Sequence, residues 1–190
     1  MNEPLRILVV CTYNRTRSVI IGALLGDALS RRGQTASIAT AGFEQAGLPA
    51  TTEAVSALAS RGIDVSDHLS ERLTGEMVEQ AQVIVTAEKV HVARICGDRL
   101  DIFQRTFTLP ELAGVVEGHL QFGSQPLANW LTSVAPERSP ASYLNTYVPE
   151  VADPTGLSPL AFASAVAEME RLSNELAGAL ELTGSGAANG

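Results

Sequence analysis

The sequence contains very little cysteine and almost no lysine. Its 190 residues include two cysteines, Cys11 and Cys96, and 13 basic residues of which Lys89 is the single lysine. Two cysteines are too few for the disulfide framework of a small secreted domain, and they suit a reducing compartment. We therefore expect a cytoplasmic protein.

Several binding signals are also missing. Acidic residues outnumber basic ones by 21 to 13, and the net charge of −8 comes without any basic run, so neither nucleic acid nor a membrane surface is an expected partner. No apolar stretch has the length of a membrane span, and no basic leader precedes one. Neither G-x-G-x-x-G nor G-x-x-x-x-G-K-S/T occurs, which argues against dinucleotide and nucleoside triphosphate cofactors. No metal-ligand spacing occurs either, so we expect no metal and no cofactor.

The apolar pattern alternates between strands and helices. With 45% hydrophobic residues, a chain of this length can bury one sizeable core. Strands alternating with helices predict an α/β protein with a parallel sheet. We expect one domain over residues 1–182 and a disordered tail over 183–190. Strands are predicted at 5–10, 36–40, 81–86 and 104–109, helices at 51–60, 74–80, 89–96, 118–134 and 157–182, and a loop at 136–149.

The chemistry is concentrated in the loop Cys11-Thr12-Tyr13-Asn14-Arg15-Thr16-Arg17-Ser18. A buried strand leads into it and a helical pattern leads out, so the backbone N–H groups and the helix dipole converge there and favour an anion. Arg17 can cradle a tetrahedral oxyanion, and the same positive field favours the thiolate form of Cys11. The alternative is that Cys11 is only a small buried apolar residue. The strand, the helix and Ser18 together favour an anion-binding nucleophile.

A thiolate that attacks phosphorus also needs a proton donor for the leaving oxygen. Asp153 is the best candidate, because it lies in the stiffened turn Asp153-Pro154-Thr155-Gly156. Aspartate is also common at the first position of an ordinary β-turn, and that interpretation stays open. Asp27 lies about 15 Å further along the first helix, too far to serve. His91 and His119 fall in helical patterns and are interpreted as structural or exposed.

These motifs together resemble the low molecular weight protein tyrosine phosphatase family. The Cys-x5-Arg-Ser loop with an internal Asn, the segment Thr40-Ala41-Gly42, the pair Gly62-Ile63 followed by His68, and the late Asp-Pro turn occur in the family's order. The resemblance implies a three-layer fold with a twisted four-stranded parallel sheet and helices on both faces. It implies a phosphocysteine on Cys11, with Arg17 and Asp153 also catalytic, and phosphate binding by the loop residues Thr12, Tyr13, Asn14, Arg15, Thr16, Arg17 and Ser18. It further implies a supporting hydrogen-bond network formed by Asn14, Ser18, Thr40 and His68.

The chain departs from the family pattern at three positions. Tyr13 stands where the family has glycine, and a tyrosine does not easily adopt positive φ. Thr16 replaces a second loop cysteine, and Thr155 replaces an aromatic residue that stacks on the substrate. Tyr143 or Tyr147 is a candidate for the missing aromatic wall.

The resemblance implies a phosphomonoester hydrolase that acts on phosphotyrosine proteins or small aryl phosphates and releases inorganic phosphate. Two alternatives remain. Arsenate is an isostere of phosphate, so the protein could be an arsenate reductase that uses an external thiol. It could also be a non-catalytic module that binds phosphoanions, although Cys11, Arg17 and Asp153 together exceed what binding requires.

Overall fold

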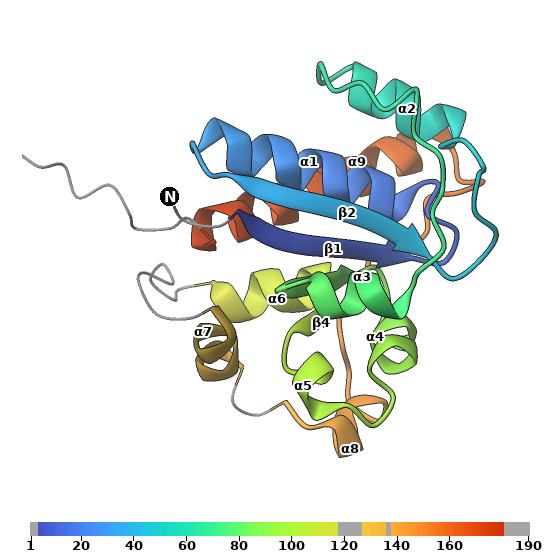
Figure 1. The fold of residues 1–190 in the computed structure, drawn as a ribbon. Helices are drawn as coiled ribbons and strands as arrows, with labels where there is room; N and C mark the ends of the chain where they lie inside the picture. Colours follow the sequence, from blue (N-terminus) through green and yellow to red (C-terminus); the bar gives the residue numbers. More distant parts are fainter. Residues whose placement is uncertain (1–3, 118–126, 136–137, 181–190) are drawn as a thin grey trace, which may run out of the picture.

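The computed structural model describes residues 4–117, 127–135 and 138–180. At its centre is a four-stranded, entirely parallel sheet in the order β2-β1-β3-β4, which confirms the predicted sheet (Figure 1). The strands are β1 (Leu5–Cys11), β2 (Ala36–Gly42), β3 (Val83–Thr86) and β4 (Thr106–Thr108).

The register of the sheet brings all four carboxyl ends to one edge. Cys11 pairs with Gly42, and Thr86 pairs with both Val10 and Thr108. Open α/β sheets bind ligands at this edge, because the loops that leave the strands meet there. The loop that follows β1 therefore lies beside the segments that follow β2, β3 and β4.

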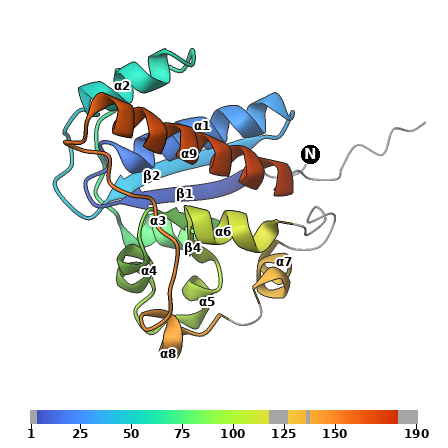
Figure 2. The same cartoon turned by 180° about the vertical axis from the view of Figure 1, so that it is seen from behind.

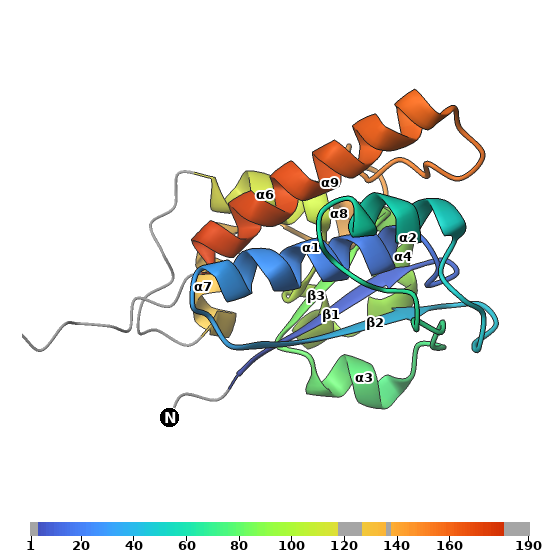
Figure 3. The same ribbon diagram turned by 90° about the horizontal axis from the view of Figure 1, so that it is seen from above.

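Helices cover both faces of the sheet. On one face α1 (Arg17–Arg31) lies alongside α9 (Pro159–Ala179), with α6 (Leu109–Val116) beside them (Figure 2). Helix α3 (Gly75–Gln80) lies on the opposite side of the strands (Figure 3), and the elements α4 (Lys89–Cys96) and α5 (Leu100–Phe103) pack there too. The remaining helices are α2 (Thr52–Ala59), α7 (Leu127–Val134) and α8 (Pro140–Tyr143).

The side chains of β1 divide between these two layers. Ile7 and Val9 pack with the α1–α9 side of the core, whereas Leu8 and Val10 pack with the side that holds α4 and α5. Successive side chains of a strand point to opposite faces, so a strand buried on both faces is mostly apolar. The run Leu5–Val10 has this composition apart from Arg6, which is half-buried near the start of the strand and donates from Nε to the Gln80 carbonyl at 2.8 Å.

Most predicted elements are confirmed, with four differences. Helices α5 and α8 were not predicted, since four residues are too few to show helical periodicity. At Pro110 the sequence indicates only a helical turn, whereas α6 spans eight residues. The final helix begins at Pro159 rather than at 157, because the Ser158 side chain caps it by accepting from the Ala161 N–H. Of the helix predicted at 118–134, α7 is confirmed, and 118–126 lie outside the described residues, as does the predicted tail 183–190. Among the described helices, none is both long and apolar enough to cross a membrane.

Candidate active site

At the loop between β1 and α1, the N-terminus of α1 has no side-chain cap. Thr16 is the N-cap of α1, but its side chain makes no capping hydrogen bond. It instead contacts the Thr51 hydroxyl at 3.2 Å. The first N–H groups of a helix have no partner within the helix. Without a side-chain cap, those of α1 remain available to a bound anion, as the sequence predicted.

Asn14 gives the loop its backbone conformation. It is the only described non-glycine residue with positive φ, at 54°, and asparagine tolerates this left-handed region better than most residues. Its side-chain Oδ1 accepts from the Glu71 N–H at 2.8 Å, and its backbone oxygen accepts from His68 Nε2 at 2.8 Å. His68 is thus placed in the network predicted for it. Tyr13 does not have positive φ, so the tyrosine fits the loop without the strain that the departure from glycine suggested.

Cys11 lies at the base of this loop, 3% exposed. Its Sγ atom is 3.1 Å from Ser18 Oγ, which in turn accepts from Asn14 Nδ2 at 2.9 Å. Because Asn14 is the donor in that second bond, the Ser18 proton is free to be donated to the sulfur. The structure therefore joins Cys11, Ser18 and Asn14 in one buried chain of hydrogen bonds.

Arg17 is held between two carboxylates. Its side chain is 5% exposed; Nη2 lies 3.0 Å from Asp153 Oδ2, and Nη1 pairs with Glu88 Oε1. Nη1 also donates to the Val151 carbonyl at 3.3 Å. A buried guanidinium is tolerated only when its charge is compensated in this way. The structure thus brings Arg17 and Asp153 together across 136 positions of sequence, and adds Glu88, which the sequence reasoning missed.

The turn that carries Asp153 is tied to the same edge of the sheet. Asp153 Oδ1 accepts from the Thr155 N–H at 3.0 Å, so one carboxylate oxygen shapes the turn while the other faces Arg17. Upstream, the Val151 N–H donates to the Ala87 carbonyl at 2.8 Å, just beyond β3. Asp153 therefore forms the expected turn and also contacts Arg17. Half of its side chain is exposed, which leaves the carboxyl group open to solvent.

Thr12 and His91 form a second contact between the loop and the sheet edge. Thr12 Oγ1 lies 3.1 Å from His91 Nε2, and the His91 ring is almost completely buried. The prediction that His91 is merely structural or exposed overlooked this contact. The available signal was its place one turn after the carboxyl end of β3, where side chains face the neighbouring loop.

Thr40 does not join the predicted network. Within the described residues its hydroxyl makes no hydrogen bond to the loop, and its methyl group lies against Gly22 of α1. The reason is strand alternation: Ile38 and Thr40 share the face of β2 that α1 covers. We therefore remove Thr40 from the network and retain Asn14, Ser18 and His68.

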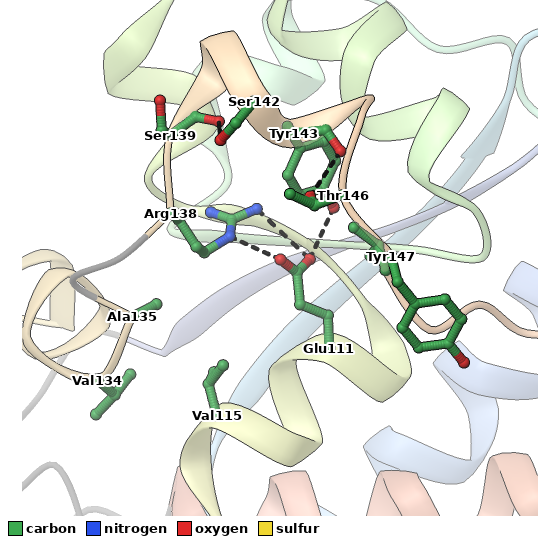
Figure 4. Close-up of a pocket in the computed structure, with 11 residues that line it drawn as sticks. Glu111, Val115, Val134, Ala135, Arg138, Ser139, Ser142, Tyr143, Thr146 and Tyr147 are labelled. Carbon is green, nitrogen blue, oxygen red and sulfur yellow. Dashed lines mark hydrogen bonds and ion pairs between the residues drawn. The ribbon is translucent and has the colours of Figure 1, made fainter.

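The two tyrosines considered as an aromatic wall have different surroundings. Tyr143 lines a pocket of about 330 Å³. Figure 4 shows its side chain beside Glu111, to which its hydroxyl donates at 2.8 Å. The carboxylate of Glu111 also pairs with Arg138 at 2.8 Å, and burial raises the pKa of the Tyr143 phenol. Tyr143 is therefore a packing residue. Tyr147 points away from that cluster and is 91% exposed. Tyr13, which is 58% exposed, is the aromatic residue that belongs to the loop itself.

No set of three or more His, Cys, Asp and Glu side chains in the described part of the chain is arranged to hold a metal ion. The two remaining loop residues connect the loop to the segment that precedes α2. Arg15 Nε donates to the Pro49 carbonyl at 2.8 Å, and Thr16 contacts Thr51.

Gly42 provides a test of how closely the loop is packed. A Cβ atom at Gly42 would lie 2.7 Å from the Asn14 nitrogen and 2.8 Å from the Thr12 oxygen, distances that force the loop backbone to move. We expect Gly42→Ala to destabilise the protein by about 1–3 kcal/mol, as overpacking does, and to weaken anion binding at the loop. Thermal unfolding measures the change in stability, and direct binding of sulfate measures the change in anion affinity.

Gly75→Ala is the matched control for Gly42→Ala, because an added Cβ at Gly75 meets nothing within 4 Å. We expect it to change stability by no more than about 0.5 kcal/mol. Sulfate binding as strong in Gly42→Ala as in Gly75→Ala would show that the loop is not shaped by this contact.

Known proteins are similar to this chain in sequence. Residues 6–115 match the family model described as low molecular weight phosphotyrosine protein phosphatase. The probable low molecular weight protein-tyrosine-phosphatase EpsP of Ralstonia solanacearum is 41% identical over 80 residues, which are 42% of this chain and 52% of that protein. The protein-arginine-phosphatase of Bacillus subtilis is 32% identical over 106 residues, which are 55% of this chain and 70% of that protein. This chain thus spans about half the length of the first curated relatives that it matches.

The fold agrees with these sequence matches. The structure of a low molecular weight protein tyrosine phosphatase from T. tengcongensis superposes with a TM-score of 0.69, covering 90% of this chain and 97% of that chain at 22% identity. The family match extends over more than half of the chain and includes the whole loop from Cys11 to Ser18. The chain belongs to the low molecular weight phosphotyrosine protein phosphatase family.

Proposed function

We propose that the protein is a cysteine-dependent phosphomonoester hydrolase, and that its substrates are phosphotyrosine proteins or small aryl phosphates. One observation carries the proposal. Arg17 belongs to the loop that has Cys11 at its base, and it pairs with Asp153 from a distant turn, while the Cys11 thiol is hydrogen-bonded to Ser18. Arg17, Cys11 and Asp153 lie at one edge of the sheet, which supports their roles as anion-binding cation, nucleophile and acid. The family membership supports the same chemistry.

The first step is attack of the Cys11 sulfur on phosphorus. The S–P bond forms as the P–O bond to the leaving group breaks, and the proton of Asp153 passes to that leaving oxygen. The Arg17 guanidinium and the loop N–H groups stabilise the charge on the equatorial oxygens. The product of this step is phosphocysteine and a free phenol or alcohol.

The second step is hydrolysis of the phosphocysteine. Asp153, now a carboxylate, accepts a proton from a water molecule, whose oxygen attacks phosphorus as the S–P bond breaks. Ser18 stabilises the departing thiolate by donating its proton across the 3.1 Å contact to Sγ. Inorganic phosphate leaves, and the Cys11 thiolate is regenerated for the next cycle without any change of oxidation state; only an oxidised cysteine would be unable to react. Both cysteines are free in the structure, which supports our proposal of a cytoplasmic, reducing location.

Arsenate reduction has less support. A reductase that resolves its intermediate internally needs a second accessible thiol. Cys96 is buried, and burial raises the pKa of its thiol, so it is poorly suited to attack. The other place where such a thiol would be expected, just after the end of β3, is occupied by Ala87. Reductase activity would therefore depend on an external thiol.

The discriminating experiment assays the purified chain with p-nitrophenyl phosphate, a phosphotyrosine peptide, a phosphoarginine peptide, and arsenate with added thiol. The phosphoarginine peptide is included because one relative is named a protein-arginine-phosphatase. We expect the two aryl phosphates to be hydrolysed fastest. Faster release from phosphoarginine would change the proposed substrate, whereas arsenate reduction without hydrolysis of either ester would overturn the proposed reaction.

A further inference from the structure

Among the described residues, His91 is a buried histidine that contacts the loop without belonging to it. Its residue is 2% exposed, and both ring nitrogens are in hydrogen-bond contact. Nδ1 accepts from the backbone N–H of Glu88 at 3.2 Å, and Nε2 lies 3.1 Å from the Thr12 hydroxyl. The histidine therefore connects the start of α4 to the residue that immediately follows Cys11.

The first of these bonds decides which nitrogen carries the proton. A backbone N–H can only donate, so Nδ1 must present its lone pair to Glu88. The neutral ring then has its proton on Nε2 and donates it to Thr12 Oγ1. The Thr12 hydroxyl, having accepted that bond, keeps its own proton free for another acceptor.

The ring also restrains the backbone of Thr12 from the other side. His91 stacks on Phe43, with ring centroids 5.4 Å apart. The Phe43 N–H donates to the Thr12 carbonyl at 2.8 Å, as does the Glu44 N–H at 3.2 Å. Thr12 is thus held at its side chain by His91 and at its carbonyl by the segment stacked on His91.

Resting on the proposed function, we propose that His91 is a positioning residue: as the neutral Nε2–H tautomer it fixes Thr12, and so orients the loop around the anion. The same ring accepts the N–H of Glu88, whose carboxylate pairs with Arg17. One histidine therefore holds Thr12 and the partner of the anion-binding arginine in a common frame.

The surroundings of His91 keep the ring neutral. Burial lowers the pKa of His91 below its ordinary value of 6.5. The carboxylates of Glu88 and Glu150 act in the opposite direction, and the guanidinium groups of Arg17 and Arg94 act with burial. Protonation would give the ring a second N–H group, at Nδ1. That group would face the N–H of Glu88 and so would break the bond between them.

Three variants separate positioning from packing. His91→Phe keeps a ring stacked on Phe43 and removes both hydrogen bonds. Thr12→Val removes the acceptor and leaves the histidine intact. His91→Gln keeps an acceptor at the third helical position, where glutamine commonly bonds the N-cap N–H, and keeps a donor for Thr12, but it does not titrate.

The probe is sulfate, a dianion throughout the working pH range, measured by direct binding and as an inhibitor. We expect His91→Phe and Thr12→Val each to weaken sulfate binding about tenfold, the double variant to lose little more, and His91→Gln to stay within about threefold of the native protein. Unchanged sulfate binding in both His91→Phe and Thr12→Val, or equal losses in His91→Phe and His91→Gln, would overturn the proposal.

Two measurements on the native protein need no variant. Nitrogen NMR of the His91 ring should show the Nε2–H tautomer, and its titration midpoint should lie below 6.5. The unfolded chain therefore takes up this proton before the folded protein does, so the stability that His91 contributes is complete above pH 6.5 and falls as the pH drops. His91→Gln should lack that component. An Nδ1–H tautomer would overturn the proposal.

Failure of the proposed function gives a different pattern. A protein that binds sulfate through His91 and Thr12 but hydrolyses no phosphate ester would retain the positioning role and lose the hydrolase. A protein that hydrolyses aryl phosphates with unaltered sulfate binding in both His91→Phe and Thr12→Val would lose the positioning role alone.

Discussion

Cys11→Ser is expected to abolish hydrolysis of p-nitrophenyl phosphate while leaving anion binding in place. The serine oxygen would occupy nearly the same position, 3% exposed and next to Ser18. A hydroxyl remains protonated where a thiol can ionise. In the described part of the chain, the side chain that contacts Cys11 Sγ is the Ser18 hydroxyl, which donates to the sulfur and is no general base. We expect turnover to fall by about 10⁴-fold or more, as when an essential nucleophile is removed.

Sulfate affinity separates loss of the nucleophile from loss of the loop. Arg17 and the uncapped N-terminus of α1 are untouched by Cys11→Ser, so sulfate should bind within about threefold of the native affinity. Cys96→Ala is the matched control, since it removes the other thiol from the opposite face of the sheet. It should lower stability through a small core cavity and leave turnover nearly native. Native turnover by Cys11→Ser would exclude the phosphocysteine.

The loop was predictable because its signals are local. The apolar run Leu5–Val10, ended by a polar loop, predicted a buried parallel strand, and the helical pattern after Ser18 placed Cys11 and Arg17 near a helix N-terminus. The parallel sheet with its aligned carboxyl ends followed from repeated strand–helix units, whereas the strand order β2-β1-β3-β4 did not follow from the periodicity. All of these arguments use neighbours in sequence.

The missed residues depend on contacts between distant segments. Glu88 lies 71 positions from Arg17 and His91 lies 79 positions from Thr12, so no local pattern links them. Thr40 illustrates the opposite error. The Thr-Ala-Gly resemblance pointed to the end of β2, which does lie beside the loop. Alternation along the strand, however, aims Thr40 at α1, and Gly42 is the residue of that motif that packs on the loop.

Asp153→Asn is expected to slow hydrolysis by about 10²–10⁴-fold, the range typical of a lost general acid. The turn itself should persist, because the asparagine Oδ1 can still accept from the Thr155 N–H. The ion pair with Arg17 Nη2 is lost, yet Glu88 still compensates the guanidinium. Sulfate would no longer compete with the Asp153 carboxylate for Arg17, so its affinity should be equal to or greater than native. A fall in kcat without loss of anion binding is the expected result.

Two esters with different leaving groups test whether Asp153 supplies the proton to the leaving oxygen. p-Nitrophenolate departs readily without a proton, whereas phenolate requires one more strongly, so the rate loss in Asp153→Asn should be larger for phenyl phosphate than for p-nitrophenyl phosphate. Asp27→Asn is the matched control, since Asp27 pairs with Arg31 on the exposed side of α1 at 2.9 Å. It should leave both rates unchanged. Equal losses on the two esters would mean that Asp153 only orients Arg17, and the acid would then have to be sought at Glu88, the other carboxylate in contact with that guanidinium.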